Sequence, residues 1–211
     1  MSPKKIMKVL SILLSGEEVG IQTWNLQNPF EVLIGTVLSQ RTRDENTSKA
    51  VKSLFSRYRS AKEISSAPVE DIEKLIRVSG FYKVKARRIK EISRIIIEKY
   101  NGSVPCDMDE LVSIPGVGRK TAGCVLVYGF GCPAIPVDTH VHRISNRLGF
   151  VKTRTPEQTE QELMARIPKE MWISLNNAMV GFGQKTCKPI GPHCWDCPLS
   201  KLCEFPEKGR G

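Results

Sequence analysis

The sequence predicts an all-α fold. Apolar residues recur at helical spacing along most of the 211 residues, and capping residues or prolines stand where these segments begin. No segment is a convincing strand. The run Cys124–Tyr128 resembles one, but it lies inside a longer segment that a Gly-x-Gly turn opens, so we expect helix there.

The first clear helix begins at Pro29. Asn28 is a capping residue, Pro29 suits a first turn, and Glu31 completes a capping box. The apolar stripe that follows consists of Phe30, Leu33, Ile34, Val37 and Leu38.

Two further helices follow in the first half of the chain. We expect Asp44 to cap the second helix, whose inner face holds Ala50, Val51, Leu54 and Phe55. Pro68 opens the third helix, whose apolar residues are Ile72, Leu75 and Ile76.

The longest predicted helix covers residues 84–100. Its inner face consists of isoleucines, at Ile89, Ile92, Ile95 and Ile96. Basic residues crowd its outer face and its approach: Lys83, Lys85, Arg87, Arg88, Lys90 and Arg94. This charge is either a solvated face or a surface for phosphate. Further helices are expected at residues 108–113, 118–130, 138–148, 156–166 and 170–182.

The chain carries 32 Lys and Arg against 22 Asp and Glu, a net charge of +10. A polyanionic partner is the natural interpretation, although charge alone also fits an acidic membrane surface or an unrelated basic enzyme. The apolar stretch Val9–Leu14 is too short for a signal peptide, and no apolar run approaches the roughly 20 residues of a membrane span. We expect a soluble, intracellular protein.

Residues 111–122 form the first segment whose sequence indicates a binding site. Pro115 ends one helix, Gly116 and Gly118 permit a tight turn with outward N–H groups, and another helix begins directly afterwards. Such a turn suits a DNA backbone phosphate without base readout. An ordinary helix-turn-helix corner is the alternative.

Lys120 stands in the first turn of that second helix, where the helix dipole disfavours a cation and favours the nucleophilic neutral amine. Residues 118–130 rise about 20 Å as a helix. The extended return from Gly131 can span at most roughly 25 Å, so the chain can bring Asp138 back beside Lys120. Phosphate contact for Lys120 and helix capping for Asp138 are the alternatives.

Seven cysteines are an odd number, and four of them crowd into the last 25 residues with the spacing C-x6-C-x2-C-x5-C. These four are Cys187, Cys194, Cys197 and Cys203. Their crowding favours a metal site over a disulfide framework. Four thiolates hold either zinc or a [4Fe–4S] cluster, and the spacing alone does not decide between them.

Together, the hairpin with Lys120, the segment Val137-Asp138-Thr139-His140 and the cysteine spacing resemble the endonuclease III family of DNA glycosylases. The segments Leu38-Ser39-Gln40-Arg41-Thr42 and Gly80-Phe81-Tyr82 look like that family's DNA-probing loops. The resemblance runs from about residue 25 to Cys203. It implies a six-helix lobe over residues 22–132 that contains the hairpin, and a second helical lobe of residues 1–21 plus 133–211 with a cluster loop at 187–203.

The resemblance implies a bifunctional DNA glycosylase and AP lyase of base excision repair, in a prokaryotic-type cytoplasm with the nucleoid. Its partner would be duplex DNA with damaged bases, expected to be oxidised pyrimidines, or with abasic sites, bound by a monomer. Lys120 would be the nucleophile, Asp138 the assisting carboxylate, and the four cysteines the ligands of a [4Fe–4S] cluster. Expected DNA contacts are Gln40, Phe81, Gly116, Gly118, Thr121, Thr139, His140 and Lys188.

The chain departs from the family pattern in two places. The loop from Cys187 to Cys194 holds only Lys188 and His193 as basic residues, and Phe81 stands where a smaller aliphatic wedge is common. Gln40 as a solvated helix end and Phe81 packed into its own hairpin are the structural alternatives. The functional alternatives are a monofunctional mismatch glycosylase, which Lys120 argues against, and a noncatalytic iron–sulfur DNA-binding protein.

Overall fold

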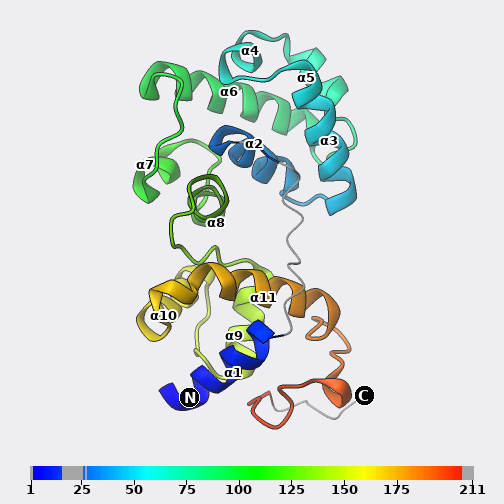
Figure 1. The fold of residues 1–211 in the computed structure, drawn as a ribbon. Helices are drawn as coiled ribbons and strands as arrows, with labels where there is room; N and C mark the ends of the chain where they lie inside the picture. The colour runs from blue at the N-terminus through cyan, green and yellow to red at the C-terminus, as the bar shows by residue number, and fades with distance from the viewer. Residues whose placement is uncertain (1, 16–25, 27, 206–211) are drawn as a thin grey trace. The chain divides into compact units, whose positions relative to one another are not determined.

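The computed structural model describes residues 2–15, 26 and 28–205, and the regular structure within them is entirely helical (Figure 1). The all-α class is therefore confirmed. The chain divides into two compact units, Thr23–Cys132 and Met1–Gln22 with Pro133–Gly211. The predicted lobe boundary at Gln22 lies outside the described residues. Within the described part of the chain, no helix is both long and apolar enough to cross a membrane.

The unit of residues 23–132 consists of helices packed around α2. They are α2 (Pro29–Ser39), α3 (Asp44–Arg57), α4 (Ala61–Ser66), α5 (Val69–Leu75), α6 (Tyr82–Tyr100), α7 (Met108–Ser113) and α8 (Arg119–Cys124). The helix predicted at 118–130 continues past α8 as a π-helical turn, Val125–Gly129.

The described part of this unit has seven α-helices, one more than the expected six, because α4 was not predicted. Six residues are too few to show an apolar stripe. The sequence does carry a capping box for it: the Glu63 N–H donates to Ser60 Oγ at 3.3 Å, and Ser60 Oγ donates to Glu63 Oε1 at 3.1 Å.

Helix α2 is buried on all its faces. Its predicted stripe is buried, and so are Val32, Gly35 and Thr36 on the other faces. Helices α3, α6, α8 and the π-helical turn pack against it. The predicted cap is confirmed, since the Glu31 N–H donates to Asn28 Oδ1 at 3.0 Å and Asn28 Nδ2 donates to Glu31 Oε1 at 3.2 Å.

Two expectations in this unit are wrong. Asp44 does not cap α3; it is the first helical residue, and the capping position belongs to Arg43, which makes no side-chain cap hydrogen bond. In the first turn, the Asp44 carboxylate still lies at the positive end of the helix dipole. Lys85 does not lie on the charged outer face of α6. It is buried, with 5% of its surface exposed, because oxygen atoms of two neighbouring loops accept hydrogen bonds from its ammonium.

The other unit is also helical. It contains α1 (Pro3–Ser15), α9 (Thr139–Leu148), α10 (Pro156–Arg166) and α11 (Trp172–Lys185), with 3₁₀ turns at Lys169–Met171 and Cys194–Asp196. Helix α11 packs against α1 and α9. Among the core residues they share are Leu10, Ile144, Phe150, Leu175 and Met179. The helix predicted to start at residue 170 starts two residues later, after a 3₁₀ turn.

The Asn28 cap gives a stability prediction. Asn28→Ala removes the acceptor for the Glu31 N–H and should lower the free energy of unfolding by about 1 kcal/mol, measured by urea denaturation. Asn28→Ser is the matched control, because serine is an equally good cap, and it should stay within a few tenths of a kcal/mol of the parent. Equal losses in the two variants would contradict a capping role.

Candidate functional site

The turn between α7 and α8 is built on two glycines with different local requirements. Gly116 has φ +83°, a left-handed conformation that favours glycine, and a Cβ there would also displace the end of the Arg88 side chain. Gly118 is the N-cap of α8, with extended backbone, and a Cβ there would meet no atom within 4 Å. The residues next to the turn, Ile114 and Val117, are buried and anchor it.

Lys120 is the second residue of α8, and its side chain is exposed. The next residue, Thr121, is buried with 4% of its surface exposed. Gln40 Nε2 donates to Thr121 Oγ1 at 3.4 Å. The structure therefore brings the predicted residue Gln40, from the end of α2, against the helix that carries Lys120.

The two segments expected to probe DNA both have a left-handed residue. Arg41 has φ +51° and Phe81, the N-cap of α6, has φ +57°. The Phe81 ring is 62% exposed, so the alternative that it packs into its own hairpin is wrong. The Arg41 guanidinium lies 5.7 Å from the centre of that ring, and this contact joins the two segments.

Lys85 lies beneath these segments and was missed as a functional residue. Its Nζ donates to the Leu38 carbonyl at 2.7 Å, the Gln40 carbonyl at 2.6 Å, Thr42 Oγ1 at 2.8 Å and Ser79 Oγ at 2.9 Å. Burial lowers the pKa of Lys85 to about 8, because desolvation disfavours the charged form.

A sequence signal for Lys85 does exist. It stands four and seven residues before Ile89 and Ile92, on the helix face that the core covers. A lysine at helical spacing within an apolar stripe indicates a buried ammonium that needs oxygen partners.

Asp138 is the N-cap of α9, so the predicted capping role is confirmed. Its Oδ1 accepts hydrogen bonds from the N–H groups of His140 at 2.8 Å and Val141 at 2.9 Å. Both bonds end on Oδ1, which leaves Oδ2 for another partner, and the residue is half-buried. The segment that leads to Asp138 is held by Asn176, a buried residue that we did not predict. Its Nδ2 donates to the Pro136 carbonyl at 2.7 Å.

The remaining predicted contacts lie in the same unit as Asp138. Thr139 is exposed at the start of α9, and His140 is half-buried with its Nδ1 3.1 Å from Arg143 Nη2. Lys188 is half-buried, with Nζ 3.4 Å from His193 Nε2. The two basic residues of the loop thus lie beside each other.

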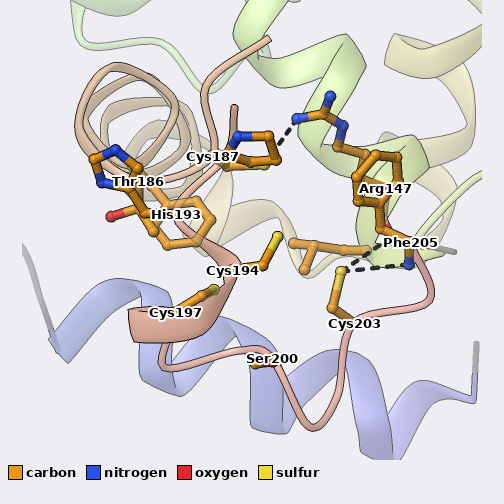
Figure 2. Close-up of a pocket in the computed structure, with 12 residues that line it drawn as sticks. Arg147, Thr186, Cys187, His193, Cys194, Cys197, Ser200, Cys203 and Phe205 are labelled. Atoms are coloured by element: carbon orange, nitrogen blue, oxygen red, sulfur yellow. Dashed lines mark hydrogen bonds between the residues drawn. The ribbon is translucent and has the colours of Figure 1, made fainter. Parts of the chain in front are cut away.

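The four predicted cysteines line one pocket (Figure 2). Burial raises the pKa of Cys197 above its ordinary value; a hydrogen bond from the Leu199 backbone opposes the shift, and the negative charges of the other three cysteines add to it. A set of four thiols in a shared pocket fits an iron–sulfur cluster in donor chemistry. In the described part of the chain, no group of three or more Cys, His, Asp or Glu side chains is arranged closely enough to hold a metal ion.

Two arginines of α9 hold the loop that carries these cysteines, a role that we did not predict for either. Arg143 Nη2 donates to the Cys187 carbonyl at 2.8 Å, and Arg147 donates to the carbonyls of Lys188 at 2.7 Å and Pro189 at 3.0 Å. Arg147 Nη1 also approaches Cys187 Sγ at 3.6 Å, and its guanidinium lies 4.3 Å from the centre of the Phe205 ring (Figure 2). Their spacing, i and i+4 on one helix, was the available signal.

Comparison with known proteins decides the family. A model of the HhH-GPD superfamily of base excision DNA repair proteins matches residues 34–169. Endonuclease III of Thermotoga maritima is 57% identical over 185 residues, which cover 87% of this chain and 87% of that protein. The chain belongs to the endonuclease III family. Endonuclease III of Escherichia coli is 35% identical over 208 residues, 99% of each chain.

Solved structures of the family agree with this assignment. A trapped endonuclease III–DNA covalent intermediate matches with a TM-score of 0.91 and 41% identity, over 97% of this chain and 96% of that chain. A thermostable thymine-DNA glycosylase matches with a TM-score of 0.87 and 27% identity, over 97% and 98%. As an endonuclease III family member, the chain is a DNA-binding glycosylase and AP lyase of base excision repair, which confirms the predicted enzyme class. The family generally carries a [4Fe–4S] cluster.

Proposed function

We propose that this chain removes oxidised pyrimidines from duplex DNA and cuts the strand through a Schiff base on Lys120. The observation that carries the proposal is the position of Lys120, exposed in the first turn of α8 directly after the glycine turn. The similar structure of a trapped endonuclease III–DNA intermediate is covalent, and a covalent intermediate requires a nucleophile on the enzyme.

The chemistry follows from an amine and a carboxylate acting on one sugar. A flipped-out nucleotide exposes its C1′. Lys120 Nζ forms a bond to C1′ as the bond from C1′ to the base breaks, and the departing base takes up a proton. Asp138 stabilises the positive sugar or accepts the proton that the amine loses. The lone pair of the attached nitrogen then breaks the bond from C1′ to the ring oxygen O4′, which takes up a proton, and an open-chain iminium results. The iminium makes the 2′ proton acidic, and loss of that proton expels the 3′ phosphate by β-elimination.

Asp138 suits this role because its capping bonds hold the carboxylate in one orientation. Two backbone N–H groups donate to Oδ1. The carboxylate can then act through Oδ2 without giving up its cap.

For DNA contact, we propose that the glycine turn binds a backbone phosphate. The open space at Gly118 supports this proposal. A side chain there would meet no other atom of the protein, so internal packing does not explain the glycine. A ligand that approaches the backbone closely would explain it, because a side chain would block that approach. Thr121, Thr139, His140 and Lys188 are proposed as further contacts.

Gln40 and Phe81 are proposed to enter the duplex when the lesion leaves it. The exposed Phe81 ring suits a wedge in the base stack, and the Gln40 amide suits a hydrogen bond to the unpaired base. Together these contacts offset the few kcal/mol of unstacking.

We further propose that Cys187, Cys194, Cys197 and Cys203 ligate a [4Fe–4S] cluster in a monomeric protein. When bound, such a cluster supplies four metal–thiolate bonds that close the C-terminal segment onto itself. Residues 186–205 contribute only Leu199 to the buried apolar core, which supports a mainly structural role for those bonds.

The nucleophile is tested by borohydride trapping on duplexes that carry different lesions. Lys120→Ala should abolish the trapped complex while DNA binding survives, because the turn's backbone groups supply the phosphate contact. Arg119→Ala, which removes the neighbouring cation, is the control and should still be trapped. Unchanged trapping in Lys120→Ala would exclude this amine, and trapping strongest on an oxidised purine would overturn the proposed substrate.

The carboxylate is tested by replacing Asp138 with asparagine. Asn is as good an N-cap as Asp, so Asp138→Asn should preserve the free energy of unfolding. Single-turnover base release should nevertheless slow by roughly 10²- to 10⁴-fold, the factor typical of a lost proton-transfer group. Base release at the parent's rate would reduce Asp138 to a helix cap.

The cluster predicts a brown protein with broad visible absorbance and about four irons per chain after anaerobic purification. Cys197→Ser should lower the yield of folded protein before it lowers intrinsic activity. Cys106→Ser is the matched control, because Cys106 is exposed and does not line the pocket, and it should keep its iron. Zinc in place of iron, or a fully stable Cys197→Ser protein without metal, would contradict the proposal.

A further inference from the structure

Lys85 is the most completely enclosed cation in the described part of the unit of residues 23–132. Four oxygens, two of carbonyls and two of hydroxyls, lie within hydrogen-bond distance of Nζ and share its three N–H groups, and no carboxylate pairs with it among the described residues. An ammonium removed from water to this extent is costly unless its partners are held in place. The function described so far gives it no role.

The partners of Lys85 belong to the two segments that carry the proposed probing residues. Leu38, Gln40 and Thr42 lie in the Gln40 loop (residues 38–42), and Ser79 lies in the Phe81 turn (residues 79–82). Lys85 therefore fixes the main chain of Gln40 itself, and it holds the Phe81 turn two residues before the aromatic ring.

Direct contacts between the two segments complete the network. Ser79 Oγ donates to the Leu38 carbonyl at 3.1 Å, and the Gly80 N–H donates to Thr42 Oγ1 at 3.0 Å. A Cβ at Gly80 would lie 2.6 Å from the Arg41 carbonyl oxygen, so the two main chains are at contact distance. This packing keeps Arg41 and Phe81 in left-handed conformations that neither residue favours alone.

We infer that Lys85 is a positioning residue for lesion recognition, whose ammonium holds the Gln40 loop and the Phe81 turn together so that both side chains enter a duplex at one place. The inference rests on the proposed roles of Gln40 and Phe81. Without the ammonium, the carbonyls of Leu38 and Gln40 lose a common donor, and the two segments can separate. Base release from duplex DNA then falls, whereas base release from single strands, where little stacking is broken, does not.

The protonation of Lys85 gives this role a pH dependence. A neutral amine has two N–H groups for four acceptors and turns a lone pair towards one of them. Burial lowers the pKa of Lys85 to about 8, so the clamp is complete below that pH and weakens as the pH rises through it. The groups facing Nζ from the Gln40 loop and the Phe81 turn are neutral oxygens, and burial is the only cause that lowers the pKa of Lys85. The titratable side chains that these two segments carry are Arg41 and Tyr82.

The test measures single-turnover base release from a duplex and from the matching single strand at pH 7, and takes the ratio of the two rates. Lys85→Met keeps the length of the side chain and removes the donor; the ratio should fall roughly 10- to 100-fold, as for loss of hydrogen bonds to a charged group. Lys90→Met is the matched control. It removes an ammonium from the same helix that donates to the Ala67 carbonyl, away from both segments, and the ratio should not change.

Gln40→Ala and the double variant Gln40→Ala/Lys85→Met separate the inference from the proposed function. If Lys85 acts through Gln40, the ratio in the double variant should be little lower than in the more impaired of the two single variants. A lowered ratio in Gln40→Ala with an unchanged ratio in Lys85→Met overturns the role of Lys85 and leaves the wedge standing. An unchanged ratio in Gln40→Ala overturns the wedge and, with it, this inference.

Two further measurements exclude a merely structural effect. In the parent the ratio should fall between pH 7 and pH 9, whereas in Lys85→Met it should be flat; a parallel fall in both proteins would overturn the inference. If Lys85→Met does not fold, Thr42→Val replaces it, because valine preserves the shape and removes the hydroxyl that accepts from Lys85 and Gly80. A lowered ratio in Thr42→Val supports the clamp, and an unchanged ratio contradicts it.

Discussion

The last carbonyl groups of α2 need hydrogen-bond donors, and the helices that pack around α2 exclude water from them. Every helix leaves its final carbonyls without partners from its own backbone, and α2 is buried on all sides, so water cannot serve them all. Lys85 supplies the donor for the Leu38 carbonyl and for the Gln40 carbonyl just beyond. The same ammonium reaches Ser79 of the Phe81 turn, so it joins the end of α2 to the turn that packs on the loop after it.

At the start of α9, one side chain serves two purposes. Asp138 caps the helix and is also the proposed catalytic carboxylate, because a cap needs one oxygen and the chemistry needs the other. Further along α9, Arg143 and Arg147 hold backbone carbonyls of the cysteine loop, in a segment with little apolar core of its own. One helix therefore orients the carboxylate at its first turn and supports the cysteine loop from its later turns.

The sequence predicted most helices because their apolar stripes and caps are local signals. Asn28 and Asp138 both cap as expected, and the helices at 108–113 and 156–166 have their predicted bounds. Helix α4 was not predicted because a six-residue helix shows too little periodicity. Lys85 was placed on the wrong face because a run of basic residues favours a solvated surface, although its spacing from Ile89 and Ile92 indicates burial. Three of its four acceptors come from residues 38–42, which are 43 to 47 residues away in sequence. No local pattern encodes such partners.

Helix α6 contacts each of the segments that we propose to contact DNA in its unit. Lys85 donates hydrogen bonds to the Gln40 loop and the Phe81 turn, and Arg88, three residues later, lies against Gly116 in the glycine turn. Each residue of a helix turns its side chain by about 100°, so one residue inserted between these two positions would swing Arg88 away from the turn. As members of this family diverge, α6 should accept substitutions on its outer face but not a change of length between residues 85 and 88.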